Sequence, residues 1–358
     1  MRRSSAKKVS SMKKYTVPIA VLLLVLTLAF AGCMSGNGSD GSATNDTGSA
    51  DINETTDTNT TDDTTGMDHE GVEGKDHDGD GSVSEAEREF ESSYGDGATV
   101  PEGTVPVTSD LQSAVEESKE GSTLVLAPGT YDGGVNLSKD LELRGFGRNQ
   151  VVVEAGPGNR DSGTGIKVAQ YANVKISNLT VSGFRKGIDL SGTYRDTVIE
   201  NVVVRSSVFG IDSRKSIADW SINRSILTGN GRGVYDRGSK GNWEIDSSVI
   251  ANSTKEGITV IGSKGGWSIR NTVFRNNALR AGNIGSGSAP VLERVDFVNV
   301  SGMKVIAPSS SGSYVMVKDS WWGNPGGAGD KDKRGYVRTQ NPCSKPCADP
   351  KVKLRSVR

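Results

Sequence analysis

A repeat of about 23 residues runs through the C-terminal half of the chain and constrains the fold more than any other feature. Each copy contains a short apolar frame, such as V-K-I-S-N-L-T-V or W-S-I-R-N-T-V-F. The apolar anchors of these frames recur every 23 or 24 residues, at Ile176, Ile199, Ile222, Ile245, Ile269 and Leu292. A period of this length indicates one supersecondary unit stacked on copies of itself, because a single copy cannot bury its own apolar face.

The residues within each repeat favour β-strands. The apolar runs are rich in Val, Ile and Thr and are bounded by Gly, Asn and Ser, which is typical of strands. A second short strand is predicted later in each repeat, for example at residues 187–189 and 210–212. Several short strands in so few residues favour coils wound around an apolar axis. Each coil then pairs in parallel with the previous one, and equivalent residues stack about 4.8 Å apart.

The segments that flank the repeats carry a family resemblance. Residues 111–134 begin with an amphipathic stretch and continue to a strand that ends in P-G-T-Y, while residues 320–327 read S-W-W-G-N-P-G-G. These features resemble the right-handed parallel β-helix family, whose architecture is shared by pectate lyases, pectin methylesterases and many surface proteins. The resemblance implies an all-β fold, a right-handed parallel β-helix solenoid over residues 107–335.

In that family a short helix covers the first coil, and an N-terminal capping helix is therefore expected here. Ser109 and Gln112 predict its capping box, and Gly121 lies where a C-cap is expected. A cover at this end matters because an open end coil exposes unpaired strand edges. The resemblance implies little about activity, since one solenoid fold supports unrelated chemistries.

The N-terminal segment predicts export and membrane attachment. Six Lys and Arg residues precede an apolar run over residues 17–31, which ends in F-A-G-C. We interpret residues 1–33 as a lipoprotein signal peptide, with Cys33 as the lipidated residue. The alternative is an uncleaved membrane anchor. Both interpretations predict an extracytoplasmic protein that is attached to a membrane.

Charge is strongly segregated along the remaining chain. Residues 34–107 contain 19 acidic and 2 basic residues, a net charge of −17, and within them residues 34–74 have the composition of a disordered tether. Residues 108–358 contain 24 acidic and 34 basic residues, a net charge of +10. A basic solenoid outside the cell favours acidic or cell-surface polysaccharide over nucleic acid as its partner. Alternatively, the acidic tether neutralises the solenoid.

An EF-hand-like loop lies between the tether and the repeats, in residues 75–96. The sequence D-H-D-G-D-G-S-V-S-E-A-E has oxygen-bearing residues at the required loop positions and Gly at the sixth. We therefore expect Ca²⁺ as a cofactor, bound with an affinity of about 10⁻⁴–10⁻³ M. The alternative is an accidental match within an acidic segment. The predicted ligands are Asp76, Asp78, Asp80, Ser82, Ser84 and Glu87.

Candidate catalytic residues on the solenoid are carboxylates and basic groups. The two histidines, His69 and His77, both precede the repeats, which excludes a His-dependent triad there. Stacked carboxylates about 5 Å apart could bind Ca²⁺ or act as an acid and base, and these residue types resemble those of uronate lyase sites. The alternative, which the short coils favour, is a solvated or ion-paired face. The candidates are Asp189, Asp212, Asp236, Arg214 and Arg232.

Two further motifs have structural interpretations. Trp220, Trp243 and Trp267 each lie two residues before an anchor. Period-2 alternation favours an inward aromatic ladder over a sugar-stacking platform. Cys343 and Cys347 lie in a Pro-rich C-terminal tail, residues 336–358, and are expected to form a disulfide outside the cell.

These features predict a monomeric, lipid-anchored surface protein. Its expected function is non-catalytic binding of acidic or cell-surface polysaccharide. A uronate lyase is the alternative, and a scaffold for another envelope protein is a third hypothesis.

Overall fold

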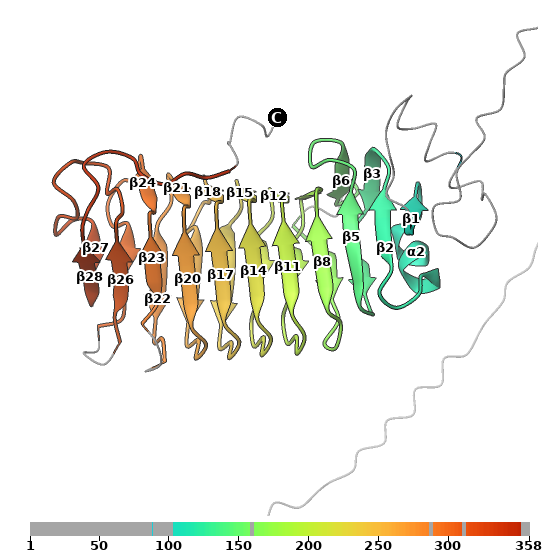
Figure 1. Ribbon diagram of the computed structural model, residues 1–358, viewed down its shortest axis with the longest axis horizontal. Coiled ribbons are helices and arrows are strands. Elements are labelled where there is room, and N and C mark those ends of the chain that lie inside the picture. Colours follow the sequence, from blue (N-terminus) through green and yellow to red (C-terminus); the bar gives the residue numbers. More distant parts are fainter. Residues whose placement is uncertain (1–87, 89–102, 158–160, 286–288, 310–312, 352–358) are drawn as a thin grey trace, which may run out of the picture. The chain divides into compact units, whose positions relative to one another are not determined.

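The computed structural model describes residues 88, 103–157, 161–285, 289–309 and 313–351. From Thr104 onward, these residues form an all-β parallel solenoid of three sheets (Figure 1), which confirms the predicted fold. Every pair of neighbouring strands in the largest sheet is parallel, as in the pairing of Ile199 with both Ile176 and Ile222. The repeat period therefore corresponds to one coil.

The three sheets run along the whole solenoid, and each contains one strand of most coils. The 11-stranded sheet consists of β1 (Thr104–Val107), β2 (Thr123–Leu126), β5 (Leu141–Gly145), β8 (Val174–Ser177), β11 (Thr197–Glu200), β14 (Trp220–Asn223), β17 (Trp243–Asp246), β20 (Trp267–Arg270), β23 (Val291–Glu293), β26 (Val315–Lys318) and β28 (Val337–Gln340). The eight-stranded sheet consists of β3 (Gly129–Asp132), β6 (Val151–Glu154), β9 (Thr180–Ser182), β12 (Val203–Arg205), β15 (Ile226–Thr228), β18 (Val249–Ala251), β21 (Val273–Arg275) and β24 (Asp296–Val298). The nine-stranded sheet consists of β4 (Val135–Leu137), β7 (Thr164–Val168), β10 (Lys186–Asp189), β13 (Phe209–Asp212), β16 (Arg232–Arg237), β19 (Ile258–Ile261), β22 (Leu279–Gly282), β25 (Val305–Ile306) and β27 (Lys333–Arg334).

A one-residue kink joins the 11-stranded sheet to the eight-stranded sheet in successive coils. The residue two positions after each anchor has a positive φ, which is the left-handed conformation that Asn tolerates better than most side chains. The chain therefore changes direction at the same point in every repeat. The kink residues are Asn178, Asn201, Arg224, Ser247, Asn271 and Arg294.

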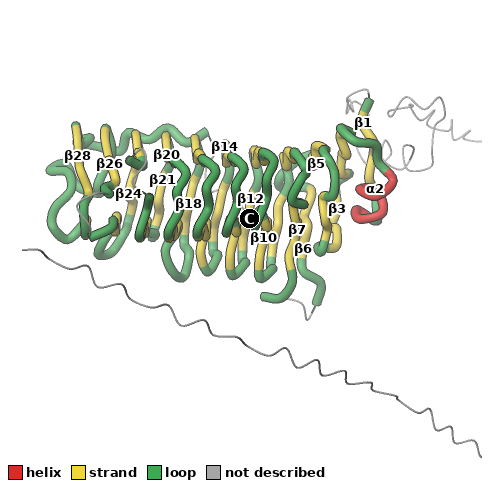
Figure 2. The backbone as a smooth tube through the Cα atoms, turned by 90° about the horizontal axis from the view of Figure 1, so that it is seen from below, coloured by secondary structure: helices red, strands yellow, loops and turns green. Residues whose placement is uncertain are grey.

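The N-terminal coil is covered by a helix, as expected from the resemblance. Helix α2 (Leu111–Glu117) lies beside β1 at one end of the solenoid (Figure 2) and buries Leu111 and Val115. Its N-cap is Asp110, whereas the sequence predicted a capping box from Ser109. The Asp110 carboxylate accepts hydrogen bonds from the backbone N–H groups of Gln112 and Ser113, which satisfies two orphan donors of the first turn. Its C-cap is Ser118, not Gly121.

The interior is a continuous apolar core built from the anchors and the second apolar residue of each repeat. Trp220, Trp243 and Trp267 belong to it. They are 3–5% exposed, and their rings stack in parallel with centroids 4.8 and 5.0 Å apart. This geometry is the inward ladder that alternation favours, and a sugar-stacking platform would require exposed ring faces.

A row of stacked glycines brings neighbouring coils of the nine-stranded sheet close together. A Cβ atom on Gly210 would lie 2.5 Å from the carbonyl oxygen of Gly233, and one on Gly233 would lie 2.5 Å from that of Gly257. These distances are shorter than a carbon–oxygen contact permits. The strands can therefore approach only where the side chain is a hydrogen atom.

We expect Gly210→Ala to lower the free energy of unfolding by about 1–3 kcal/mol, because the added methyl group must displace the backbone of the next coil. Chemical denaturation would measure the change. Gly156→Ala is the matched control, since its Cβ would meet no atom within 4 Å, and we expect a change within about 0.5 kcal/mol. Equal stability of Gly210→Ala and the wild type would show that the coils adjust without cost.

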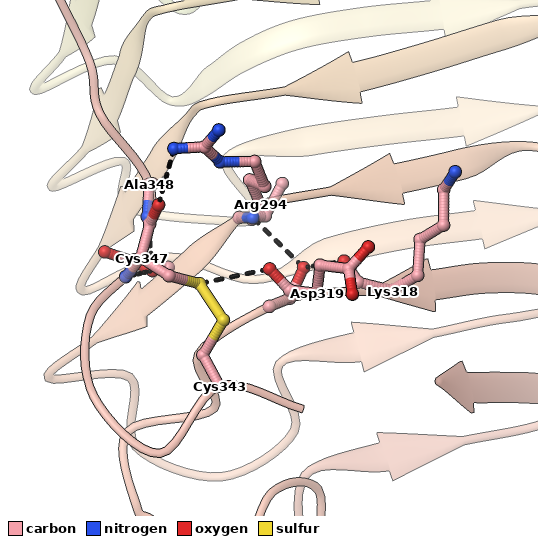
Figure 3. The surroundings of a disulfide bond; sticks show 9 residues. Arg294, Lys318, Asp319, Cys343, Cys347 and Ala348 are labelled. Carbon is pink, nitrogen blue, oxygen red and sulfur yellow. Dashed lines mark hydrogen bonds between the residues drawn. A yellow bond between two sulfur atoms is a disulfide. The ribbon is translucent and has the colours of Figure 1, made fainter. Parts of the chain in front are cut away.

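The solenoid extends beyond the predicted boundary at residue 335, because β28 pairs in parallel with β26 through Gln340. The chain then forms the Cys343–Cys347 disulfide. Figure 3 shows this loop beside Arg294 and Asp319. The Cys347 N–H donates to the carboxylate of Asp296, a buried residue of β24. Hydrogen bonds therefore hold the C-terminal segment against the last coils, while the disulfide closes a loop within that segment.

Candidate functional site

The predicted carboxylate row begins on two neighbouring strands of the nine-stranded sheet. Asp189 of β10 and Asp212 of β13 are register partners. The next two strands present Tyr235 and Thr259 at the same position. The sequence period therefore placed Asp189 and Asp212 together correctly, but the row continues with an aromatic and a hydroxyl side chain.

Asp236 does not extend this row. It follows Tyr235 by one residue, and successive strand residues point to opposite faces. Its side chain lies inside the solenoid, fully buried, where its carboxylate accepts hydrogen bonds from the Ser239 hydroxyl and, at 3.0 Å, from Trp243 Nε1. Burial raises the pKa of Asp236, while hydrogen bonds from Ser239 and Trp243 act in the opposite direction.

Asp189 and Asp212 are neutralised by neighbouring cations. Lys186 Nζ lies 2.7 Å from Asp189 Oδ2 and 3.4 Å from Asp212 Oδ2. Arg214 binds Asp212 through both carboxylate oxygens, with Nε 2.8 Å from Oδ1 and Nη2 2.6 Å from Oδ2. Both carboxylates are buried, with Asp189 5% and Asp212 0% exposed. The two carboxylates therefore match the ion-paired alternative to a catalytic site, and they are buried instead of solvated.

Two cations of this face lie over aromatic rings. The Arg214 guanidinium carbon lies 5.7 Å from the Phe209 ring centroid and 5.5 Å from that of Tyr235. Arg232 lies 5.3 Å from the Tyr235 centroid, and the two rings stack with centroids 5.0 Å apart. The side-chain hydrogen bond with Asp212 raises the pKa of Arg214 above its ordinary value. The arrangement holds two guanidinium groups, each paired with a carboxylate, against aromatic surface.

Arg232, the second predicted basic residue, has partners of its own. Its Nε donates to the Thr259 hydroxyl at 3.1 Å and lies 3.5 Å from a Glu256 carboxylate oxygen. It stands one coil away from Phe209, its register partner. The structure therefore places Arg214 on the Asp212 carboxylate and Arg232 on the Tyr235 ring, without bringing Arg232 to the carboxylate pair.

Sequence reasoning missed Lys186, Phe209 and Tyr235. The repeat period predicts that Lys186, Phe209 and Arg232 lie side by side, because each precedes a glycine of the stacked row by one residue. The structure shows them as register partners. Tyr235 carries no such signal, because it takes the position that Asp189 and Asp212 hold in the two preceding strands.

The remaining predicted site residues lie elsewhere. The calcium loop with Asp76, Asp78, Asp80, Ser82, Ser84 and Glu87, and the lipidation residue Cys33, fall outside the described residues. Within the described ranges, no group of three or more His, Cys, Asp and Glu side chains is placed to hold a metal ion. No helix in the described part of the chain is long and apolar enough to cross a membrane.

A family model matches part of the solenoid. Residues 135–287 match the model of the family described as periplasmic copper-binding protein (NosD). No curated protein sequence matches the chain. The matched segment covers the coils that contain Lys186, Asp212 and Arg232.

Several solved structures are similar to the chain at low identity. An alginate lyase from Paenibacillus sp. str. FPU-7 is 16% identical, with a TM-score of 0.43, 66% of this chain and 99% of that chain covered. The pectate lyase Pel9A is 12% identical, with a TM-score of 0.46 and coverage of 68% and 76%. The pectin methylesterase PemA from Erwinia chrysanthemi is 11% identical, with a TM-score of 0.43 and coverage of 66% and 93%.

The residues of the matched segment do not fit a copper site. Imidazole nitrogen and the sulfur atoms of Cys and Met are the side-chain ligands that favour copper. Residues 135–287 contain no His, Cys or Met. In the described C-terminal region, the two cysteines are joined in the disulfide. The matched segment therefore lacks the soft side-chain ligands that a copper site needs.

Proposed function

We propose that this chain is an extracytoplasmic, lipid-anchored β-helix protein that binds acidic polysaccharide without catalysis. The observation that carries the proposal is the arrangement of charged and aromatic side chains on the outer face of the nine-stranded sheet. Its carboxylates are internally paired, and Arg214 and Arg232 stand over the Phe209 and Tyr235 rings. Guanidinium groups held against aromatic rings can donate hydrogen bonds to sugar carboxylates, and the rings can pack against apolar sugar faces. The net charge of +10 over residues 108–358 adds a longer-range attraction for a polyanion.

The same contacts support binding over catalysis. A uronate lyase needs a group that can accept a proton, but the carboxylate of Asp212 holds the Arg214 guanidinium in its charged form and raises its pKa. Asp189 and Asp212 are buried and already paired with Lys186 or Arg214. They offer a poor Ca²⁺ site, since a cation would have to displace both partners.

Four parts of the proposal rest on sequence and family likeness. The net charge of +10 over residues 108–358 favours a polyanion. The word periplasmic in the matched family's description supports an extracytoplasmic location. Lipid attachment at Cys33 and Ca²⁺ binding at residues 76–87 remain proposals, and Ca²⁺ would stiffen the segment between tether and solenoid.

The test is binding of the full chain to alginate, polygalacturonate and neutral dextran, each with and without Ca²⁺. Calorimetry would follow binding, and ultraviolet absorbance would follow unsaturated cleavage products. We expect saturable binding to the two acidic polymers only, weakened by salt, with constant absorbance. Rising absorbance would establish the uronate lyase instead. Absence of binding to both acidic polymers would overturn the proposal and favour a scaffold role.

A further inference from the structure

The exposed apolar side chains of the solenoid gather on one corner. We define the corner ridge as the loops that join the nine-stranded sheet to the 11-stranded sheet in five successive coils, residues 169–173, 190–196, 213–219, 238–242 and 262–266. Three of the six large exposed apolar side chains in the described part of the chain lie on it. They are Tyr171, Tyr194 and Ile217, which are 71%, 47% and 39% exposed.

These three side chains form a single file across neighbouring coils. The Tyr171 and Tyr194 rings stack with centroids 5.3 Å apart and an interplanar angle of 25°. Backbone hydrogen bonds fix the alignment, because Tyr194 N donates to the previous loop at 2.7 Å and Ile217 N donates to the loop of Tyr194 at 2.8 Å. An exposed apolar file of this kind indicates an interaction site, since scattered exposed residues would show no such alignment.

The file continues with lysines. Lys240 N and Lys264 N each donate to the preceding loop at 2.8 Å, in the pattern of Ile217. Both lysines are exposed. In five successive coils, the aligned loop position therefore holds two aromatic residues, then one aliphatic residue, then two lysines. The coils are spaced about 4.8 Å apart along the solenoid axis.

Three lysines of the ridge are available to a ligand, whereas Arg214 is paired with Asp212. Within the described ranges, Lys215, Lys240 and Lys264 form no salt bridge. The exposed carboxylates are engaged with the backbone, because Asp196 accepts from Asp219 N at 3.2 Å and Asp219 accepts from Asn242 N at 2.6 Å. The ridge thus carries three lysines without an ion pair, beside two exposed carboxylates that keep their charge while they accept hydrogen bonds from the turns.

The shape of this surface fits a polymer better than a globular partner. A stable protein interface needs about 800 Å² on each side, whereas this file is one side chain wide. A sugar polymer is narrow, can contact the exposed edges of aromatic side chains along its length, and carries its carboxylates at regular intervals. Its axis would follow the file, because the favourable positions repeat only in that direction.

We propose that acidic polysaccharide binds along the corner ridge, parallel to the solenoid axis. Its sugar rings contact the exposed edges of Tyr171 and Tyr194, whose facing surfaces are stacked on each other, and its carboxylates pair with Lys240 and Lys264. This inference rests on the proposed function and adds the corner ridge, which contains Arg214, to the surface that would bind the polymer.

The test compares variants of the full chain for binding to alginate and polygalacturonate. We expect Tyr194→Ala to weaken binding about 3- to 10-fold, and Lys240→Gln with Lys264→Gln to weaken it and to reduce its salt dependence. Tyr336→Ala is the control, because Tyr336 is 46% exposed but lies outside the ridge, and its binding should equal that of the wild type. Unchanged thermal unfolding would confirm that the exposed substitutions leave the fold intact.

The outcomes separate the two proposals. If polysaccharide binding survives both ridge substitutions, or if Tyr336→Ala weakens it equally, the ridge assignment is wrong and the proposed function still stands. Absence of wild-type binding overturns the proposed function. Vesicles of phosphatidylglycerol provide a second arm. If the ridge variants lose vesicle binding but keep polysaccharide binding, the ridge is a membrane surface and the assignment is wrong.

Discussion

Trp243→Ala is expected to lower the free energy of unfolding by about 3–5 kcal/mol, the cost of removing a large buried aromatic side chain. Trp243 is 3% exposed and lies between Trp220 and Trp267, with ring contacts on both sides. The substitution also removes the N–H donor of a buried carboxylate, Asp236. Loss of packing and loss of a hydrogen bond therefore add at one position.

Chemical denaturation of Trp243→Ala and Trp243→Phe would measure and separate the two effects. The phenyl ring keeps most of the stacking area but lacks the donor, and we expect an intermediate loss. A change below about 1 kcal/mol for Trp243→Ala would mean that the neighbouring indoles close the cavity, which would contradict the view of the ladder as a rigid element.

Asp236→Asn is expected to change how stability depends on pH. Burial raises the pKa of Asp236 above its ordinary value of 3.8, and the nearby charge of Asp212 adds to the shift. Because the folded-state pKa lies above the unfolded value, the folded protein binds the proton more tightly. The contribution to stability is complete below the unfolded pKa and is lost as pH rises through the folded pKa.

Asparagine does not titrate in this range and keeps an oxygen that can accept from Trp243 Nε1. The stability of Asp236→Asn relative to the wild type should therefore increase as pH rises from about 3.8, the ordinary carboxyl value, and level off above the folded pKa. Denaturation at several pH values would record this difference. Asp236→Ala is the comparison, with an expected loss of about 1–3 kcal/mol because the indole donor is left unpaired. A pH-independent difference for Asp236→Asn would mean that burial does not alter the titration.

The repeat period predicted the coils, the parallel pairing and the partnership of Asp189 with Asp212, because these properties follow directly from residue spacing. Alternation also placed Trp243 in the interior. Asp236 was grouped with the outer carboxylates although it lies one residue past their position, and the same alternation rule explains why it points inward.

Other parts of the site depend on contacts that spacing does not encode. Lys186 bridges two carboxylates from different coils, and this geometry requires the strands to be placed first. The corner ridge was missed for a related reason. Tyr171, Tyr194 and Ile217 lie in loops whose neighbours in sequence give no apolar pattern, and they become a file only when the coils stack.

The register of the strands also locates the one extra residue in the 24-residue interval. Val249 pairs with Ile226, 23 residues earlier, whereas Ile258 pairs with Val234, 24 residues earlier. In the loop between β18 and β19, Lys255 N donates to a backbone carbonyl of the previous coil at 2.9 Å. One coil earlier, Arg232 N makes the equivalent hydrogen bond at 2.9 Å. The added residue is therefore Glu256, directly after the last aligned loop position and before Gly257.

The corner between the eight- and nine-stranded sheets can thus change length while the strands on both sides keep their partners. One coil later it contracts, because Leu279 pairs with Ile258 only 21 residues away, although Val273 and Val249 are 24 apart. The left-handed kink on the other side of the eight-stranded sheet remains a single residue, as at Asn201 and Asn271. Evolution could enlarge this variable corner into a binding loop without rebuilding the scaffold, whereas an insertion at the kink would displace every inward side chain that follows it.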